Sequence, residues 1–257
     1  MRKFYTRLNW FLIPLLVIIS SCSKEKEKKS QDKSEASSTK TNKADSIVVS
    51  QAVTVETKKD PNDFVPQGYK IFKKSFGDLN NDGLQDCILI IKKIDDTHIV
   101  DHESRGKLDM NRRGIIVLFK NQKGYQLAAE NRNCFSSENE DGGVYYSPEL
   151  LVEAENGNLI VHYAHGRYGY WRYIFRYQNS GFELIGYDES SNNGPLVMST
   201  TSINFSTKKK RIQTNTNESA EGGDEIFETT WSTIKINQLL NLTEIKDFDE
   251  LKMAYSI

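Results

Sequence analysis

Apolar and polar residues alternate along most of the chain between residues 69 and 235, with the two-residue period of half-buried β-strands. In Asp86–Lys93 the alternation gives way to a continuous apolar run, which indicates a buried strand. The pattern predicts strands at Tyr69–Phe76, Asp86–Lys93, Gly114–Asn121, Tyr125–Glu130, Leu150–Glu155, Leu159–Ala164, Tyr168–Tyr177, Phe182–Tyr187, Val197–Ser206, Arg211–Asn215 and Ile226–Lys235.

Short turns separate these strands. Asn156-Gly157 is a strong hairpin signal, because both residues tolerate the positive φ angles of a type I′ turn. Strands joined in this way form an antiparallel meander, so we expect an all-β fold with sandwich-like sheets and room for short helices only at residues 238–255. Two charged stretches, residues 95–113 and 131–148, interrupt the pattern.

The first 21 residues have the layout of a secretory signal: a basic start, an apolar run and a small-residue end. The end of this segment, Ile19-Ser20-Ser21-Cys22, resembles the lipobox of bacterial lipoproteins. The resemblance implies cleavage before Cys22, a diacylglycerol on its thiol and attachment to a membrane. An ordinary signal, or a short anchor with an incidental cysteine, is the alternative.

Residues 22–62 are rich in Lys, Glu, Ser and Thr, and such a composition predicts a solvated tether ahead of a single β-rich domain at residues 63–257. The charged run after Cys22 resembles signals that send some Bacteroidetes lipoproteins to the cell surface. We therefore expect an outer-membrane lipoprotein of the cell envelope, with the periplasmic and the surface-exposed orientation both open.

The chain balances 34 basic against 35 acidic residues, so it has no excess of positive charge with which to hold phosphates. Nucleic acid is therefore not an expected partner. Beyond Cys22 the only cysteines are Cys87 and Cys134. An exported protein could pair them, but Cys87 lies in an apolar run and fits a buried thiol equally well.

The segment Asp78–Asp86 places oxygen-bearing groups at alternate positions, as a hard cation such as Ca²⁺ requires. The candidate ligands are Asp78, Asn80, Asp82, the Leu84 carbonyl and Asp86, and Gly83 permits the sharp turn. An EF-hand would need a bidentate Glu at the twelfth position and a following helix, whereas this chain has Leu89 and a predicted strand.

The loop resembles that of FG-GAP and VCBS-type repeats, whose D-x-N-x-D-G-x-x-D pattern it matches. The resemblance implies a structural Ca²⁺ between two strands; an Asx-rich turn without a metal is the alternative. A single copy of the loop argues against a propeller built from such repeats.

More broadly, the order of elements resembles a group of small secreted or lipid-anchored bacterial proteins with no assigned activity. The shared pieces are the metal loop, Gly124–Asn131, Gly142-Gly143, Asn156-Gly157 and Tyr170–Tyr177. The resemblance implies a β domain and leaves its function open.

The aromatic segment Tyr168–Tyr177 carries the other candidate site. Strand alternation would place Trp171, Tyr173 and Phe175 in the core. The opposite face would then present an aromatic and cationic set suited to binding, made up of Tyr168, Tyr170, Arg172 and Arg176. The alternative is a solvated face on which arginine stems cover the tyrosines.

No nucleophile motif stands out, and no pair of carboxylates is singled out for catalysis. The first functional hypothesis is therefore a binding or scaffolding module for an envelope protein or polysaccharide. A hydrolase of envelope or extracellular polymers and an immunity or inhibitor lipoprotein are the alternatives.

Overall fold

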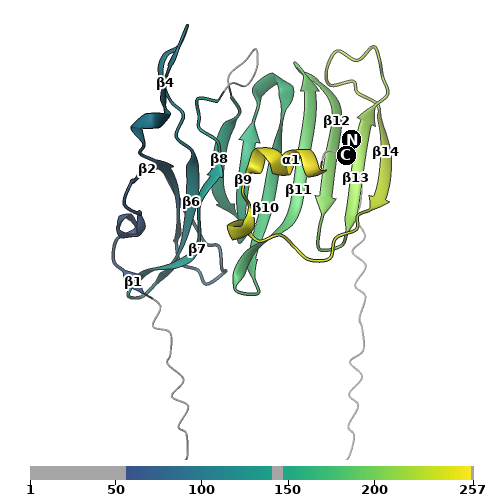
Figure 1. Ribbon diagram of the computed structural model, residues 1–257. Helices are drawn as coiled ribbons and strands as arrows, with labels where there is room; N and C mark the ends of the chain where they lie inside the picture. The colour runs from purple at the N-terminus through teal and green to yellow at the C-terminus, as the bar shows by residue number, and fades with distance from the viewer. Residues whose placement is uncertain (1–55, 141–146, 256–257) are drawn as a thin grey trace, which may run out of the picture. The chain divides into compact units, whose positions relative to one another are not determined.

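A computed structural model of the chain describes residues 56–140 and 147–255, and its strands form two large antiparallel sheets and one small hairpin (Figure 1). The five-stranded sheet consists of β1 (Thr57–Lys58), β7 (Gly124–Phe135), β6 (Arg113–Asn121), β3 (Asp86–Lys93) and β2 (Tyr69–Gly77), in that spatial order. The seven-stranded sheet runs from β14 (Phe227–Thr233) through β13 (Lys209–Asn215), β12 (Leu196–Asn204), β11 (Gly181–Asn193), β10 (Gly169–Gln178) and β9 (Asn158–Ala164) to β8 (Glu149–Glu155). This architecture confirms the expected all-β fold.

Every strand of the seven-stranded sheet lies beside its neighbours in sequence, so the predicted meander is confirmed there. The β8–β9 turn has Asn156 at φ 51° and Gly157 at φ 73°, the two positive values of a type I′ turn. This turn brings β8 and β9 into the register Glu155 opposite Asn158.

In the five-stranded sheet, two of the strand pairs are not neighbours in sequence: β1 pairs with β7, and β6 pairs with β3. The stretch between β3 and β6 contains a 3-10 helix, η2 (Asp96–His98), and a hairpin of β4 (Ile99–His102) and β5 (Gly106–Asp109) that the sequence pattern did not predict. At the sheet's edge, β1 pairs with β7, and the 3-10 helix η1 (Pro61–Phe64) follows. The folded unit therefore starts before the boundary at residue 63 that composition suggested.

The central strands of the five-stranded sheet, β3 and β6, are buried on both faces. Alternate residues of β3 enter two different hydrophobic clusters: Ile88 and Ile90 in the larger, Leu89 and Ile91 in the smaller. Residues of η1 and of the segment after it cover the smaller cluster, since Phe64 packs against it. A strand enclosed on both sides needs apolar residues at every position, which explains the continuous run in this part of the sequence.

The two cysteines of this sheet are free and buried. Cys87 belongs to the smaller cluster and Cys134 to the larger, so they lie on opposite faces. Burial raises the pKa of the Cys87 thiol to about 11. Of the two readings of these cysteines, the buried thiol is the one that the structure supports.

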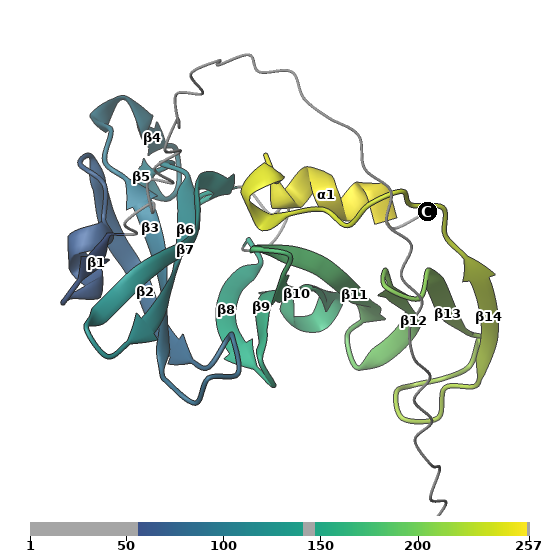
Figure 2. The same ribbon diagram turned by 90° about the horizontal axis from the view of Figure 1, so that it is seen from below.

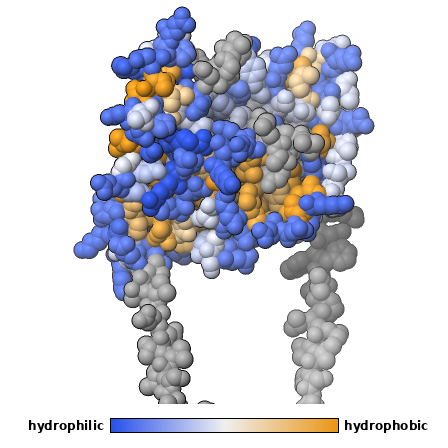
Figure 3. All heavy atoms as spheres, in the orientation of Figure 1, coloured by the Kyte–Doolittle hydropathy of each residue, from blue (hydrophilic) through white to orange (hydrophobic). Residues whose placement is uncertain are grey.

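The seven-stranded sheet has one covered face. Figure 2 shows α1 (Phe248–Tyr255) lying across one side of this sheet, with no described helix or strand over the other side. The covered, inner face carries Trp171, Tyr173 and Phe175 of β10, which are buried as strand alternation predicted. In Figure 3, hydrophobic residues also gather beside the C-terminal segment on this inner side.

The C-terminal segment ties the two sheets together. Asn131 of β7 donates to the carbonyl oxygens of Leu242 (2.9 Å) and Ile245 (2.7 Å), at and after the 3-10 helix η4 (Leu242–Glu244). The Phe248 ring stacks on Phe135 at 4.9 Å and meets Tyr173 at 5.0 Å, so it contacts both sheets. Among the described residues, no helix has the length and hydropathy to cross a membrane.

Candidate functional site

The predicted metal loop lies between β2 and β3. Its first residue, Asp78, accepts hydrogen bonds from the backbone N–H groups of Asn80 and Asp82, each at 3.2 Å, and of Gly83 at 2.8 Å. Gly83 has φ 81°, which accounts for a glycine at this position. Burial alone would raise the pKa of Asp78, but the Gly83 N–H and its neighbours bring it below its usual value.

Asp86, at the end of the loop, is fully buried. Its two carboxylate oxygens accept hydrogen bonds from the backbone N–H groups of Leu79 and Lys120, both at 2.8 Å. Burial raises the pKa of Asp86, and the nearby charges of Asp82 and Asp78 add to this effect. Asp86 therefore ties the loop to β6 and is a buried carboxylate beside two others.

The loop is closed by internal hydrogen bonds. The Asn80 amide donates to Asp82 at 3.0 Å, and Asp82 accepts from the Leu84 N–H at 2.8 Å. Within the described ranges, no group of three or more His, Cys, Asp or Glu side chains is arranged to hold a metal ion.

The donor set nevertheless fits Ca²⁺ in its chemistry: carboxylates, an amide oxygen and a carbonyl within one tight loop. A carboxylate oxygen that accepts one N–H keeps a second lone pair for a cation. Binding would require Asn80 and Asp82 to exchange their mutual hydrogen bond for the ion.

The aromatic strand β10 places Tyr170, Arg172 and Arg176 on the outer face of the seven-stranded sheet, opposite to the core residues. Tyr168 does not join them. It ends the 3-10 helix η3 (Gly166–Tyr168), and its ring lies 5.2 Å from that of His165. Gly169, at φ 103°, turns the chain between Tyr168 and the strand, so alternation does not extend to Tyr168.

The three remaining residues of the predicted face have neighbours on the same face. The Tyr170 ring stacks on the His162 ring at 5.3 Å with an interplanar angle of 16°. Arg172 lies 3.5 Å from a carboxylate oxygen of Asp188 and 3.8 Å from one of Glu155.

Long side chains also shield apolar surface on this face. Ile160 of β9 lies opposite Ile174 and is only 3% exposed, although no described element covers it. Arg176 donates to the Asn158 side chain on the adjacent strand at 3.2 Å. These contacts support the alternative interpretation, in which arginine stems cover part of the face. The aromatic feature that remains on the outer face is the stacked pair of Tyr170 and His162.

Farther along the sheet, one row of the outer face is polar and uncharged. Tyr170 lies opposite Ser190 of β11, which lies opposite Thr200 of β12, which in turn lies opposite Gln213 of β13. Ser190 is buried and its hydroxyl donates to Asn192, whereas Thr200 and Gln213 are half-buried. Their hydroxyl and amide groups can each donate and accept hydrogen bonds.

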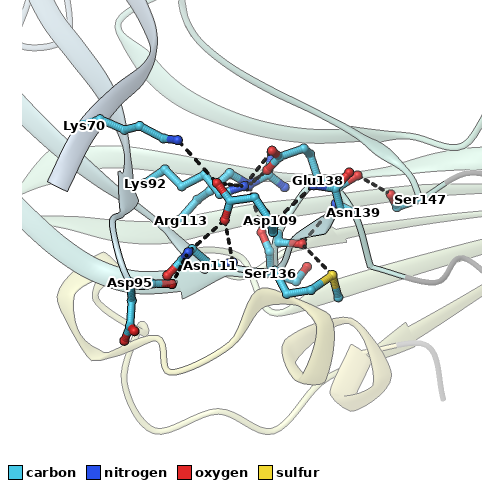
Figure 4. Close-up of polar contacts among 12 residues, drawn as sticks. Lys70, Lys92, Asp95, Asp109, Asn111, Arg113, Ser136, Glu138, Asn139 and Ser147 are labelled. Atoms are coloured by element: carbon cyan, nitrogen blue, oxygen red, sulfur yellow. Dashed lines mark hydrogen bonds and ion pairs between the residues drawn. The ribbon is translucent and has the colours of Figure 1, made fainter. Parts of the chain in front are cut away.

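The structure brings together a buried polar cluster that the sequence analysis missed (Figure 4). The Lys92 side chain is 1% exposed, and its Nζ lies 2.6 Å from Glu138 and 3.3 Å from Asp109. Lys70 reaches the same Asp109 at 3.3 Å from the solvent side. The signal in the sequence is slight: one lysine ends an apolar strand, and its partners are 17 and 46 residues away.

This cluster anchors the two charged stretches that interrupt the strand pattern. Asn139 donates to the Asp109 carbonyl at 2.9 Å, and Ser147 donates to the Glu138 carbonyl at 2.8 Å. Burial alone would raise the pKa of Asp109, but hydrogen bonds from Asn111 and Lys92 lower it to about 2. Two carboxylates face one another here, yet a buried cation lies between them.

The far edge of the seven-stranded sheet carries exposed aromatic residues that the sequence analysis did not single out. Trp231 of β14 is 64% exposed and Phe227 is 38% exposed. In the segment Phe227–Thr233 both alternate with threonines on one face, which is the signal that could have drawn attention to them.

Cys22, the predicted lipidation site, lies outside the described residues, as do Gly142 and Gly143. Comparison with known proteins adds no relative: no family model matches the chain, and no curated protein or solved structure matches it either.

Proposed function

We propose that this chain is a lipid-anchored cell-envelope protein whose seven-stranded sheet binds a polysaccharide on its outer face. The single observation that carries the proposal is the outer face itself: a stacked Tyr170–His162 pair lies beside a row of hydroxyl and amide groups, and no described helix or strand covers them.

The chemistry of this face suits a sugar polymer. A sugar ring has a C–H face that packs on flat aromatic rings and hydroxyl groups that exchange hydrogen bonds with Thr200 and Gln213. Burial lowers the pKa of His162, and the charge of Arg172 lowers it further. At any pH above the usual histidine pKa the imidazole is therefore neutral, and it stacks on Tyr170 without a charge.

The hydrolase alternative receives less support. In Figure 4 the carboxylates of Asp109 and Glu138 face each other, and both contact the buried Lys92. A glycosidase pair needs one protonated and one free carboxyl group next to the substrate. These two carboxylates neutralise a buried cation, which suits a structural role.

Two further parts of the proposal concern attachment and stability. Cys22 carries the lipid, and the tether that follows it holds the β domain at the membrane. Ca²⁺ binds the loop through Asp78, Asn80, Asp82, the Leu84 carbonyl and Asp86, where it balances the three carboxylates and stabilises the β2–β3 connection.

Binding can be tested by co-sedimenting the full chain, in detergent, with insoluble envelope and extracellular polysaccharides. The double variant Tyr170→Ala/Arg172→Ala should weaken binding by at least about tenfold, since central aromatic and arginine contacts dominate such interfaces. Phe76→Ala is the matched control, because Phe76 is also an exposed aromatic residue (50%) but belongs to the five-stranded sheet. Equal binding by the double variant and the unmodified chain would refute the proposed face.

A further inference from the structure

Strand β14 forms a free edge of the seven-stranded sheet. It pairs with β13 on one side, and no described strand pairs with its other side. All seven of its residues are exposed, on both faces of the sheet. An edge of this length presents unpaired backbone groups to solvent and can pair with another strand.

The backbone groups that point away from the sheet can be identified. The Thr216 N–H donates to the Ile226 carbonyl at 2.7 Å, and the Ile234 N–H donates to the Lys208 carbonyl at 3.0 Å. In an antiparallel ladder the residues that bond to the partner strand alternate with residues that do not. Even-numbered residues of β14 therefore bond to β13, and the residues whose N–H and C=O groups face the open edge are Phe227, Thr229, Trp231 and Thr233.

This edge lacks the features that usually prevent edge pairing. Its sequence, FETTWST, has no proline and no lysine, and its register with β13 continues without a shift from Lys209–Thr233 to Asn215–Phe227. The other edges differ. The edge strand β1 has two residues, whereas β2 carries three lysines and a register shift between Ile71 and Lys73 and lies against β8.

We propose that β14 is a homodimer interface, at which two copies of the chain pair their β14 strands antiparallel about a two-fold axis through Thr230. This register places edge-facing residues opposite one another: Phe227 opposite Thr233 of the second copy, and Thr229 opposite Trp231 of the second copy. The edge groups of both strands are then paired, and the two sheets join into one continuous sheet.

A second copy is the occupant that the side chains favour. The two Trp231 rings become diagonal neighbours on the outer face, and each Phe227 ring becomes a diagonal neighbour of the other copy's Trp231, at the ~7–8 Å separation that aromatic side chains bridge. Exposed aromatic surface is thereby covered in both copies. The only charged residue of the strand, Glu228, lies opposite Ser232 and not opposite itself, so no like charges face one another across the paired strands.

Cysteine cross-linking tests this register in the full chain within its membrane. At the two-fold axis Thr230 faces its own copy in a non-hydrogen-bonded pair with Cα atoms about 4.5 Å apart, within the range of a disulfide. Under mild oxidation Thr230→Cys should shift the chain to twice its monomer mass on a non-reducing gel. The matched control is Ser232→Cys, equally exposed, whose two copies would lie about 13 Å apart along the strands and should stay monomeric.

Failure to cross-link Thr230→Cys, equal cross-linking of both variants, or a cross-link to a different protein would overturn the proposal. Of the three native cysteines, Cys87 and Cys134 are buried, and Cys22 carries the lipid under the proposed function, so none of them should compete. The unmodified chain, run beside both variants, should therefore stay monomeric.

A second variant separates dimerisation from folding. Thr229→Pro removes an N–H that faces the open edge and leaves the bonds to β13 in place, so the thermal unfolding of the monomer should change little. In detergent, sedimentation of the full chain should give a dimer, and Thr229→Pro should weaken it by about tenfold, because each dimer loses two hydrogen bonds.

A dimer unaffected by Thr229→Pro would contradict the pairing. A monomer whose Thr229 and Trp231 amides resist hydrogen exchange would also contradict it, since another part of the same chain would then cover the edge.

Discussion

The two sheets bury their strands in different ways. In the five-stranded sheet, β3 contributes residues to hydrophobic clusters on both faces, and even its Lys92 is buried against two carboxylates. In the seven-stranded sheet, β10 is buried on one face, whereas the arginines of its other face reach solvent and pair with neighbouring strands. The central strands of the five-stranded sheet are thus enclosed on both faces, whereas the seven-stranded sheet presents its outer face to solvent.

This difference determines what a charged side chain does in each sheet. A buried ion pair leaves an uncompensated charge when one partner is lost, whereas an ion pair at the surface contributes little. Three measurements test this contrast.

The largest effect is expected from Lys92→Met. Among the described cations, removal of this buried one leaves Asp109 with only Lys70 and Glu138 with only Arg113, so the free energy of unfolding should fall by about 3 kcal/mol, the lower end of the range for a buried pair. Urea unfolding of the full chain measures the loss. Lys70→Met is the control: Lys70 contacts the same Asp109, but its side chain is 52% exposed, and the loss should stay below about 1 kcal/mol. Equal losses would show that the cluster is not enclosed.

An intermediate effect is expected from Ca²⁺. At about a hundredfold excess over its dissociation constant, Ca²⁺ should stabilise the chain by about 2–3 kcal/mol relative to EDTA. Hydrogen exchange should slow at the amides of β2 and β3 and stay unchanged in β12 and β13, far from the loop. Asp82→Asn, at an exposed loop position, should abolish the gain with little change in EDTA. An identical melting temperature with Ca²⁺ and with EDTA would remove the metal from the proposal.

The smallest effect is expected from Arg172→Met on the open sheet. The Arg172 side chain is 30% exposed, and its pairs with Asp188 and Glu155 are 3.5 and 3.8 Å long, so the loss should stay below about 1 kcal/mol. The matched variant is Arg113→Met in the enclosed sheet, where a 3% exposed arginine donates to the Ser136 carbonyl at 2.8 Å. A larger loss at Arg172 than at Arg113 would reverse the comparison.

Much of this contrast could be predicted from the sequence. The strand at Asp86–Lys93 has the predicted bounds, because a strand with two buried faces leaves an unbroken apolar run. The core face of β10 was also predicted correctly from alternation at Trp171, Tyr173 and Phe175. The local sequence pattern is therefore sufficient to predict a strand whose burial is regular along its length, whether continuous or alternating.

The rest depends on contacts that no local pattern contains. The β4–β5 hairpin was missed because its residues are mostly exposed and show no apolar alternation. Lys92 and Glu138 are 46 residues apart, and β6 and β7 lie between them in the sequence, so their contact depends on how these strands pair. Tyr168 was assigned to the strand because its aromatic character resembles that of its neighbours, whereas the turn at Gly169 decides its position. The open edge at β14 follows from strand order, which alternation alone does not specify.

The position of Phe248 has a consequence for the order of folding. Strands β8 to β14 pair with their sequence neighbours and can form hairpin by hairpin as the chain is synthesised, with little loop-closure entropy to overcome. Phe248 follows every described strand in the sequence, so the ring that joins Phe135 to Tyr173 can reach them only after β14 has been synthesised. A chain interrupted between β14 and Phe248 should therefore hold both sets of paired strands without this aromatic contact between the sheets.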